Sequence, residues 1–426
     1  MDDLRRRAAQ FGVNGRFDVT FPAVFAEVDM KVVQVNDIYS IVGGSEKTTR
    51  RSAEGLRGRG CEVHVLHGED RLPPTAYVHY VPGLARATLW RYRPVKGRLL
   101  ALLAEIRPDV VHFRNFDSPP VIAAVNRVYP TVRTVHTVWT YCPMATKFGV
   151  NREEACDRPF GLACLARAGR LGCAQRHAGG VVGWGELVRR VAACYAFRAV
   201  DRRSDATIVT SQWMKDLLTT CGLAAARVRV IPPPIDIPAA PKDINGGPPT
   251  VMSVGRMVPG KGFDDLIRAL PYLGKIRLTR VGDGPEREHL RALAAELGVA
   301  ARVDFLGWVP YDRLADYYNA AHVVALPSLW PEAFGNVGVE ALSYGRPVVA
   351  YDVGGVRDWL RDQEVGLLAR PHDVLDLAAK LSWLLERPGR ACAMGRAGRE
   401  RAKEFSLAFH VERTLAVYRE VTGERA

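Results

Sequence analysis

The chain has 426 residues, which exceeds the size of one ordinary hydrophobic core and predicts two domains. Charged residues make up 25% and hydrophobic residues 48%, which is ordinary for a soluble globular protein, and no apolar run approaches the roughly 20 residues that span a bilayer. The net charge of +13 suits phosphorylated small molecules or anionic lipid, although the basic residues are scattered and an ordinary solvated basic surface is the alternative. Nucleic acid is not expected as a partner, because no nucleic-acid-binding motif accompanies the charge.

Residues 1–29 do not join the pattern that begins at Met30. They lack the charged-then-apolar order of a signal peptide, and we interpret them as an N-terminal extension of uncertain order. Without an export signal the protein is expected in the cytoplasm, with peripheral contact at the inner membrane face left open.

Short β-branched runs alternate with amphipathic segments through the first half of the chain. These runs predict buried parallel strands over 31–37, 62–68, 109–115, 131–137 and 206–211. Strands that alternate with helices indicate a doubly wound parallel sheet, so a first domain is expected over 30–240.

A stretch dense in proline and glycine, 227–249, continues neither a strand nor a helix and is interpreted as an interdomain linker. The alternation then restarts and predicts a second domain over 249–404. Its expected strands are 251–257, 276–284, 302–308, 322–328, 346–352 and 365–370. The remaining segment, 405–426, predicts an amphipathic helix that packs back across the domain junction.

The predicted fold class is therefore α/β, with two facing Rossmann-like domains. Ligands of open α/β sheets bind outside the carboxyl ends of the strands. A site in the cleft between the two domains follows as the expectation.

The stretch VGRMVPGKGFDDLIRAL predicts a strand, a Pro-Gly turn and a helix that opens near Gly262. Arg256 would stand at the strand end and Lys261 in the turn. Two cations beside a helix N-terminus favour a phosphate or diphosphate, whereas two exposed loop cations would be the ordinary structural alternative.

The stretch LPSLWPEAFGNVGVEALSYG predicts a strand, a glycine turn and a short helix that Gly345 closes. Backbone N–H groups at the start of this helix can meet an anion, from residues Phe334, Gly335, Asn336 and Val337. Glu332 would reach beyond the phosphates, and Glu340 could accept two hydrogen bonds from a diol such as ribose. Glycoside hydrolysis by the two carboxylates is disfavoured, because the anion-binding turn separates them.

These motifs in this order resemble the retaining GT-B glycosyltransferases of family 4, from about Met30 to the end and most closely over 251–356. The signature E-x7-E is matched by Glu332 and Glu340, and VGDGPERE, FLGWVP and the glycine pair at 354–355 match neighbouring patterns. The resemblance implies a hexosyltransferase that uses a nucleotide diphosphate sugar.

The resemblance also implies roles for individual residues of the second domain. Arg256 and Lys261 match contacts to the donor diphosphate, Glu332 a contact to the donor sugar, and Glu340 a contact to the ribose. The turn at 334–337 matches backbone contacts to sugar and phosphate. Gly307 and Trp308 fall where the nucleobase is usually held.

The first domain carries fainter matches. Gly43 and Gly44 resemble the glycine pair that lets the donor phosphates approach, and His136 resembles the histidine that is aimed at the donor sugar. Two departures concern acceptor and sugar details: many relatives have aspartate where Thr137 stands, and a second histidine where Arg114 stands.

No D-x-D motif occurs in the chain, so a divalent metal is not expected in catalysis and no other cofactor is required. Fixed cations and helix termini would stabilise the leaving diphosphate electrostatically. The resemblance to retaining GT-B enzymes implies that the acceptor attacks on the face from which the diphosphate leaves, with a donor phosphate oxygen as base, so that the configuration is retained. Two alternatives stay open: a nucleotide-sugar epimerase of the same fold, and a catalytically silent sugar-nucleotide-binding subunit.

Four of the eight cysteines fall in an insertion at 142–183. Clustered cysteines in a cytoplasmic protein suggest a metal before disulfides, but no spacing is C-x2–4-C. A structural zinc, disulfides and free thiols all stay open for Cys142, Cys156, Cys164 and Cys173.

The sequence does not identify the substrates. The donor could be of UDP, GDP or ADP type, and the acceptor could be a small molecule or lipid-linked.

Overall fold

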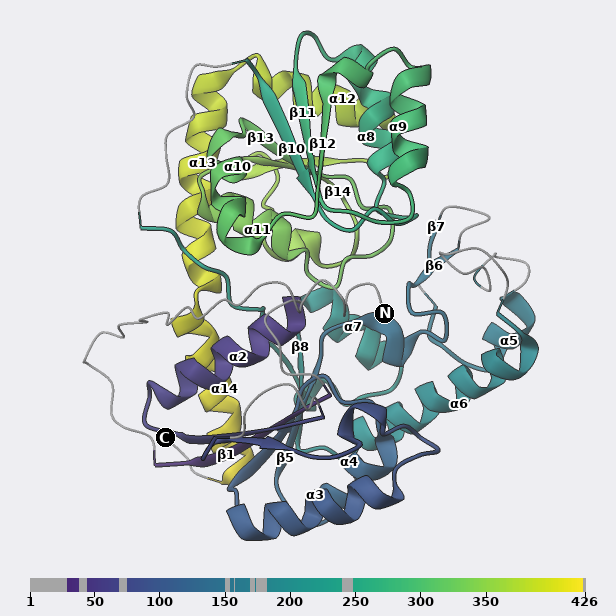
Figure 1. Ribbon diagram of the computed structural model, residues 1–426, viewed down its shortest axis with the longest axis vertical. Helices are drawn as coiled ribbons and strands as arrows, with labels where there is room; N and C mark the ends of the chain where they lie inside the picture. The colour runs from purple at the N-terminus through teal and green to yellow at the C-terminus, as the bar shows by residue number, and fades with distance from the viewer. Residues whose placement is uncertain are drawn as a thin grey trace. The chain divides into compact units, whose positions relative to one another are not determined.

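The computed structural model describes most of the chain after the N-terminal extension. The described residues are 29–37, 44–68, 75–149, 154–156, 158–168, 173, 182–239 and 248–423. The predicted extension therefore lies almost wholly outside the described residues, as does Gly43. By its internal contacts the chain divides into two compact units (Figure 1). Of the residues described, those within 29–136, 203–207 and 407–423 form unit 1, and those within 137–202 and 208–406 form unit 2.

The first sheet has seven strands in the order β3-β2-β1-β4-β5-β8-β9. Its strands are β1 (Lys31–Asn36), β2 (Glu62–His67), β3 (Val78–Tyr80), β4 (Val110–Phe113), β5 (Thr131–Val135), β8 (Ala206–Val209) and β9 (Val228–Val230). The pairings of β1 with β2 and β4, of β2 with β3, and of β4 with β5 are all parallel. Almost every residue of β1, β2, β4, β5 and β8 is buried, as expected for a parallel sheet covered on both faces.

The second sheet has six parallel strands in the order β12-β11-β10-β13-β14-β15. Its strands are β10 (Thr250–Val254), β11 (Arg277–Val281), β12 (Val303–Gly307), β13 (Val323–Leu326), β14 (Val348–Tyr351) and β15 (Gly366–Ala369). Its hydrophobic core is continuous, with Val323, Val348 and Val349 at its centre fully buried. All eleven predicted strands are thus present.

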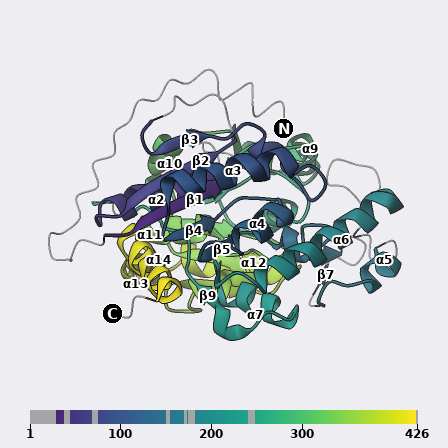
Figure 2. The same ribbon diagram turned by 90° about the horizontal axis from the view of Figure 1, so that it is seen from below.

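Helices connect the strands of both sheets. They are α2 (Gly44–Arg57), α3 (Arg93–Ile106), α4 (Pro119–Val125), α5 (Ala163–Arg167), α6 (Trp184–Asp201), α7 (Gln212–Thr220), α8 (Phe263–Ala269), α9 (Arg287–Glu296), α10 (Leu314–Ala320), α11 (Asn336–Ser343), α12 (Val374–Leu385), α13 (Pro388–Ala402) and α14 (Leu407–Thr422). The last of them, α14, packs against α2 and against strands β4 and β5 of unit 1. Figures 1 and 2 show α14 and α2 side by side from two directions.

Two sequence expectations need correction. The segment 227–249 is not linker from its start, because Val228–Val230 form strand β9 at the edge of the first sheet. The insertion at 142–183 lacks strand periodicity, yet it contains a two-stranded antiparallel pair, β6 (Phe148–Gly149) and β7 (Glu154–Ala155). Strands this short carry too few side chains to show an alternating pattern.

None of the helices in the described ranges combines the length and the apolar character needed to cross a membrane.

Candidate functional site

The candidate site in unit 2 lies where the strand order of the second sheet changes direction. From β10 the chain proceeds outward through β11 and β12, and from β13 it proceeds the other way through β14 and β15. In a doubly wound sheet the carboxyl ends of the two strands at such a switch point border a ligand-binding crevice. The loop after β10 carries Arg256 and Lys261, and the loop after β13 carries Glu332.

Lys261 and Glu332 form an ion pair in this position. The Lys261 Nζ donates to the Glu332 Oε1 over 2.6 Å, and the two side chains are only 20% and 13% exposed. Ser328 donates its hydroxyl to the same carboxylate oxygen. The Lys261 ammonium also lies 5.0 Å from the centre of the Trp330 ring, a cation–π distance. Sequence reasoning placed both charges at the site, and the structure shows that they contact each other.

The pKa of Glu332 reflects this environment. Burial by itself would raise the pKa of the carboxyl, but the Lys261 charge and the hydrogen bonds from Lys261, Ser328 and Trp330 hold it below its ordinary value. Glu332 is therefore a carboxylate at neutral pH, fixed by its partners and able to accept hydrogen bonds from a ligand hydroxyl.

The turn before α11 has the geometry predicted for it. Gly335 caps the helix with φ 91°, a left-handed conformation that favours glycine. The Trp359 indole N–H donates to the Phe334 carbonyl over 2.7 Å, and the same ring packs on Gly338, which leaves no room for a side chain there. The helix closes at Gly345, as predicted, with φ 68°. The N-terminus of α11 is thus held rigidly at the switch point, where its N–H groups can attract an anion.

Glu340 lies in the second turn of α11 and is half-buried. The hydroxyl of Tyr318, a buried residue of α10, donates to the Glu340 Oε2 over 3.0 Å. Burial and the adjacent Glu340 raise the pKa of Tyr318 well above its ordinary value, so the phenol stays protonated and remains a donor. One carboxylate oxygen of Glu340 is engaged in this contact, which fixes the orientation of the group.

The remaining predicted residues of unit 2 lie at the ends of neighbouring strands. Arg256 is exposed in the loop after β10. That loop is held by the buried Arg280 of β11, which donates to the Gly255 carbonyl over 2.6 Å and stacks on Phe263. Gly307 ends β12, and Trp308 beside it is 49% exposed, so its ring can offer a stacking surface.

In unit 1, Gly44 begins α2 and His136 directly follows β5. His136 is half-buried, and its Nε2 has no hydrogen-bond partner among the described residues. Burial, and then the nearby Arg114 charge, lower the pKa of His136 to about 3, so the ring is neutral. The prediction that the two halves share one site stays a prediction.

The four cysteines of the insertion are free thiols. Burial raises the pKa of Cys173 to about 11, and the other three, Cys142, Cys156 and Cys164, are close enough to add to that rise. In the ranges that the structure describes, however, no three His, Cys, Asp or Glu side chains form a group that could hold a metal ion. Zinc binding stays a prediction, and metal analysis of the purified protein tests it: about one equivalent per chain would support it, and a folded, metal-free protein would refute it.

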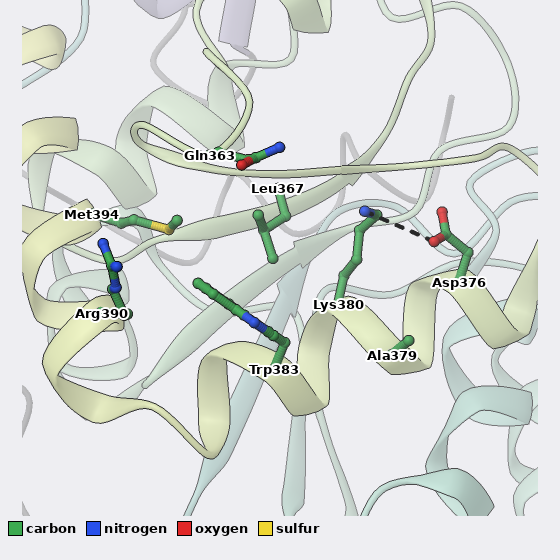
Figure 3. Close-up of a pocket in the computed structure, with 8 residues that line it drawn as sticks. All are labelled: Gln363, Leu367, Asp376, Ala379, Lys380, Trp383, Arg390 and Met394. Atoms are coloured by element: carbon green, nitrogen blue, oxygen red, sulfur yellow. Dashed lines mark ion pairs between the residues drawn. The ribbon is translucent and has the colours of Figure 1, made fainter.

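A separate pocket of about 430 Å³ lies in unit 2 between α12, α13 and the region of β15 (Figure 3). Its lining residues are Gln363, Leu367, Asp376, Ala379, Lys380, Trp383, Arg390 and Met394. No residue predicted from the sequence to bind the donor lines it. It has no part in the candidate site.

Sequence reasoning missed the residues that hold the charged groups in place. Ser328, Tyr318, Trp359 and Arg280 each contact a predicted residue or its loop. Of these four, only Ser328 is near its partner in sequence, four residues before Glu332, so only its contact could have been predicted locally. Tyr318 meets a residue 22 positions away and Arg280 one 25 positions away, and such pairings are set by the sheet order.

Two family models together match most of the chain. Residues 42–238 match Glycosyltransferase Family 4, and residues 236–401 match Glycosyl transferases group 1. The boundary between the two matches coincides with the segment after β9.

Two curated relatives share about a third of their aligned residues with this chain. A D-inositol 3-phosphate glycosyltransferase from Acidothermus cellulolyticus is 37% identical over 51% of this chain and 54% of its own length. A GDP-mannose-dependent alpha-(1-6)-phosphatidylinositol monomannoside mannosyltransferase from Mycobacterium tuberculosis is 34% identical over 56% of this chain and 68% of its own. The chain thus spans about half to two-thirds of the length of these relatives.

Solved structures share the fold. A sucrose-phosphate synthase from Thermosynechococcus elongatus superposes with a TM-score of 0.71 at 22% identity, over 93% of this chain and all of its own. HepE from Anabaena in complex with UDP superposes with a TM-score of 0.69 at 20% identity, over 92% of this chain and all of its own. Two parallel-sheet α/β domains of this kind are the GT-B fold. By its two family matches and its mannosyltransferase relative, the chain belongs to the family 4, group 1 glycosyltransferases of GT-B fold.

Proposed function

We propose that the protein is a retaining glycosyltransferase that transfers a sugar from a nucleotide diphosphate sugar to an acceptor hydroxyl without a divalent metal. The observation that carries the proposal is the Lys261–Glu332 pair beside the N-terminus of α11 at the switch point of the second sheet. It sets one cation and one row of backbone donors next to a fixed carboxylate. The cation and the backbone donors can bind a diphosphate, and the carboxylate can accept hydrogen bonds from the hydroxyls of the attached sugar.

Each residue has a role in the proposed reaction. Lys261, Arg256 and the α11 N-terminus bind the diphosphate and stabilise the charge that develops as it leaves. Glu332 binds hydroxyls of the donor sugar, and the oriented Glu340 binds the ribose diol. His136, neutral by its lowered pKa, would offer a hydrogen bond to the sugar without placing a second cation beside it.

The ion pair gives this arrangement a useful property. Before the donor arrives, Lys261 neutralises Glu332. A diphosphate can share the ammonium, because Lys261 presents three donors and the Glu332 oxygen takes one of them. The site is therefore charge-balanced without ligand and needs little rearrangement to accept one, which lowers the cost of binding.

The relatives narrow the substrates worth testing. The names of these relatives include GDP-mannose, inositol 3-phosphate and a phosphatidylinositol mannoside, while the HepE structure holds UDP. A further relative, from Streptomyces kanamyceticus, is a 2-deoxystreptamine glucosyltransferase. We propose UDP- or GDP-sugars as the donors and a cyclitol-type hydroxyl, on a small molecule or a lipid headgroup, as the acceptor.

Two measurements test the proposal. A thermal-shift screen against UDP, GDP and ADP and their sugars should give a rise in unfolding temperature with one base, since a ligand that binds only the folded state stabilises it. The Lys261→Met and Arg256→Gln variants should respond much less. An undiminished response in both variants would contradict the assignment.

Activity separates transfer from the alternatives. Release of free nucleoside diphosphate only after acceptor is added supports transfer, whereas an epimerase changes the donor without an acceptor and a silent subunit does neither. Transfer should be unaffected by EDTA, and the anomeric configuration of the product, read by NMR, should match that of the donor. A rate that depends on added Mg²⁺ or Mn²⁺ would refute metal independence.

A further inference from the structure

Arg114 is a buried arginine that no described residue pairs with. It directly follows β4 and is 3% exposed, and its Nε and Nη1 have no hydrogen-bond partner within the described part of the chain. The other arginines buried in the described ranges do have partners: Arg59 contacts Glu412, Arg280 donates to carbonyls, Arg346 donates to the Asn319 carbonyl, and the charge of Arg133 acts on Asp117. A buried charge without a partner is costly, so its retention calls for an explanation.

Among the residues that the structure describes, no carboxylate acts on the charge of Arg114. Burial lowers the pKa of Arg114 to about 10, and the one group that opposes this shift is the phenol of Tyr418 on α14. The neighbouring His112 is fully occupied, since its Nδ1 lies 2.6 Å from the Tyr418 hydroxyl and its Nε2 2.6 Å from the Thr134 hydroxyl. The guanidinium therefore remains a cation at neutral pH with donors to spare.

Position adds a second argument. The strand order of the first sheet changes direction between β1 and β4, and Arg114 lies at the carboxyl end of β4, at this switch point. The 14-residue helix α2 follows β1 in the chain and packs against α14, the helix that carries Tyr418 (Figure 1). The half-buried His136 is close enough for the Arg114 charge to lower its pKa, and its Nε2 also has no hydrogen-bond partner among the described side chains and backbone.

We propose that Arg114 and His136 form a phosphoryl-binding subsite in unit 1, distinct from the Lys261 site in unit 2. The planar guanidinium offers two donors to phosphate oxygens, and the neutral imidazole offers a third. The inference rests on the proposed function for the source of the phosphoryl group, which is either the donor diphosphate or a phosphorylated acceptor. The chemistry recognised is the same in both cases.

The first test uses inorganic phosphate and the full chain in a phosphate-free buffer. Phosphate should raise the unfolding temperature of the wild-type protein. Arg114→Met, which keeps the unbranched apolar stem of the side chain and removes its charged group, should weaken the phosphate response at least tenfold in apparent dissociation constant. Arg98→Gln, an exposed arginine on α3 of the same unit, is the matched control and should respond like the wild type.

Stability in the absence of phosphate separates a binding role from a structural one. Removing an uncompensated buried charge should leave the unfolding temperature of Arg114→Met unchanged or higher. Arg59→Met breaks the ion pair with Glu412 and should lower it. An Arg114→Met variant that unfolds as early as Arg59→Met and keeps its full phosphate response would overturn the proposal, as would a wild-type protein with no phosphate response.

The Lys261 site also attracts phosphate, so the phosphate responses of Arg114→Met, Lys261→Met and the double variant are compared. Independent sites give additive losses of response, whereas a single shared site gives the combination no further loss; the latter result would contradict a distinct subsite. Titrations with UDP and GDP, and with D-inositol 3-phosphate against inositol, then identify the source. Loss of the nucleotide response in Arg114→Met assigns the donor, and loss of the inositol phosphate response alone assigns the acceptor. If the wild type binds phosphate through Arg114 but ignores both nucleotides, the subsite stands and the proposed function fails.

Discussion

Replacing Lys261 by methionine removes the cation that neutralises the Glu332 carboxylate. The two side chains are 20% and 13% exposed and their charged atoms are 2.6 Å apart, so most of the surrounding medium is protein. Breaking a buried pair by removing one partner costs roughly 3–5 kcal/mol, because the remaining charge is left uncompensated. The residual exposure of Lys261 places this pair at the lower end, about 3 kcal/mol. For a domain of 150–250 residues that loss lowers the unfolding temperature by roughly 6–12 °C.

The pH dependence of the free energy of unfolding distinguishes the wild type from Lys261→Met more specifically than the loss of stability does. In the wild type the pKa of Glu332 is lowered by Lys261, so its contribution to stability is complete above the ordinary value of 4.5 and is lost as pH falls through the lowered pKa. In Lys261→Met only burial and the neutral hydrogen bonds remain, and burial raises the pKa. The variant should therefore gain stability as pH falls from 7 towards 5, and its deficit should narrow.

Urea unfolding of the two proteins between pH 5 and 8 measures both effects. Lys275→Met, at an exposed position of the same unit, is the control and should change stability little. A deficit for Lys261→Met below about 1 kcal/mol, the value of an exposed pair, with no dependence on pH, would refute the reasoning.

Two further perturbations test how the structure is held. In Gly338→Ala the new Cβ would lie 2.0 Å from the Trp359 ring, so overpacking should cost about 1–3 kcal/mol in urea unfolding, while Gly389→Ala, with open space around it, should stabilise by about 0.4–1 kcal/mol. Equal effects at the two glycines would contradict the packing argument. Burial raises the pKa of both Asp37 and Asp117, and for Asp37 the neighbouring Asp117 adds to the rise. Stability should fall as pH rises above 4, because the folded state holds these protons more tightly, and Asp37→Asn should flatten the fall; an unchanged slope would show that the pair is not responsible.

Much of the candidate site in unit 2 follows from short stretches of sequence. Glycines with positive φ at 262 and 335, each just before a helix, mark the two turns, and the charged residues stand within a few positions of them. Turn chemistry of this kind acts over four or five residues, so it is legible without the rest of the chain. The strand positions were equally legible, because residues buried on both faces of a parallel sheet form continuous apolar runs. Strands β3 and β9 escaped notice because they have three residues each.

The pairings that give the site its electrostatics were not legible. Lys261 meets Glu332 across 71 positions, and Arg114 lies close enough to His136 to act on its pKa across 22. The residues next to them in sequence do not indicate that the Glu332 carboxylate is neutralised by a cation, or that the Arg114 guanidinium has no carboxylate partner among the described residues. From the sequence, Arg114 was notable only because many relatives have a histidine at its position. The structure shows that it is buried with no partner for its Nε and Nη1 among the described residues, which suggests a binding role.

The sequence by itself determined the two α/β units, the order of their strands and helices, and the turns that carry charge, because these depend on hydrophobic period and on backbone conformations that few residues adopt. Only the tertiary structure decided which strand ends lie together at each switch point, and hence which charges meet. Those contacts depend on the order of strands within the sheet, which brings together residues that are far apart along the chain.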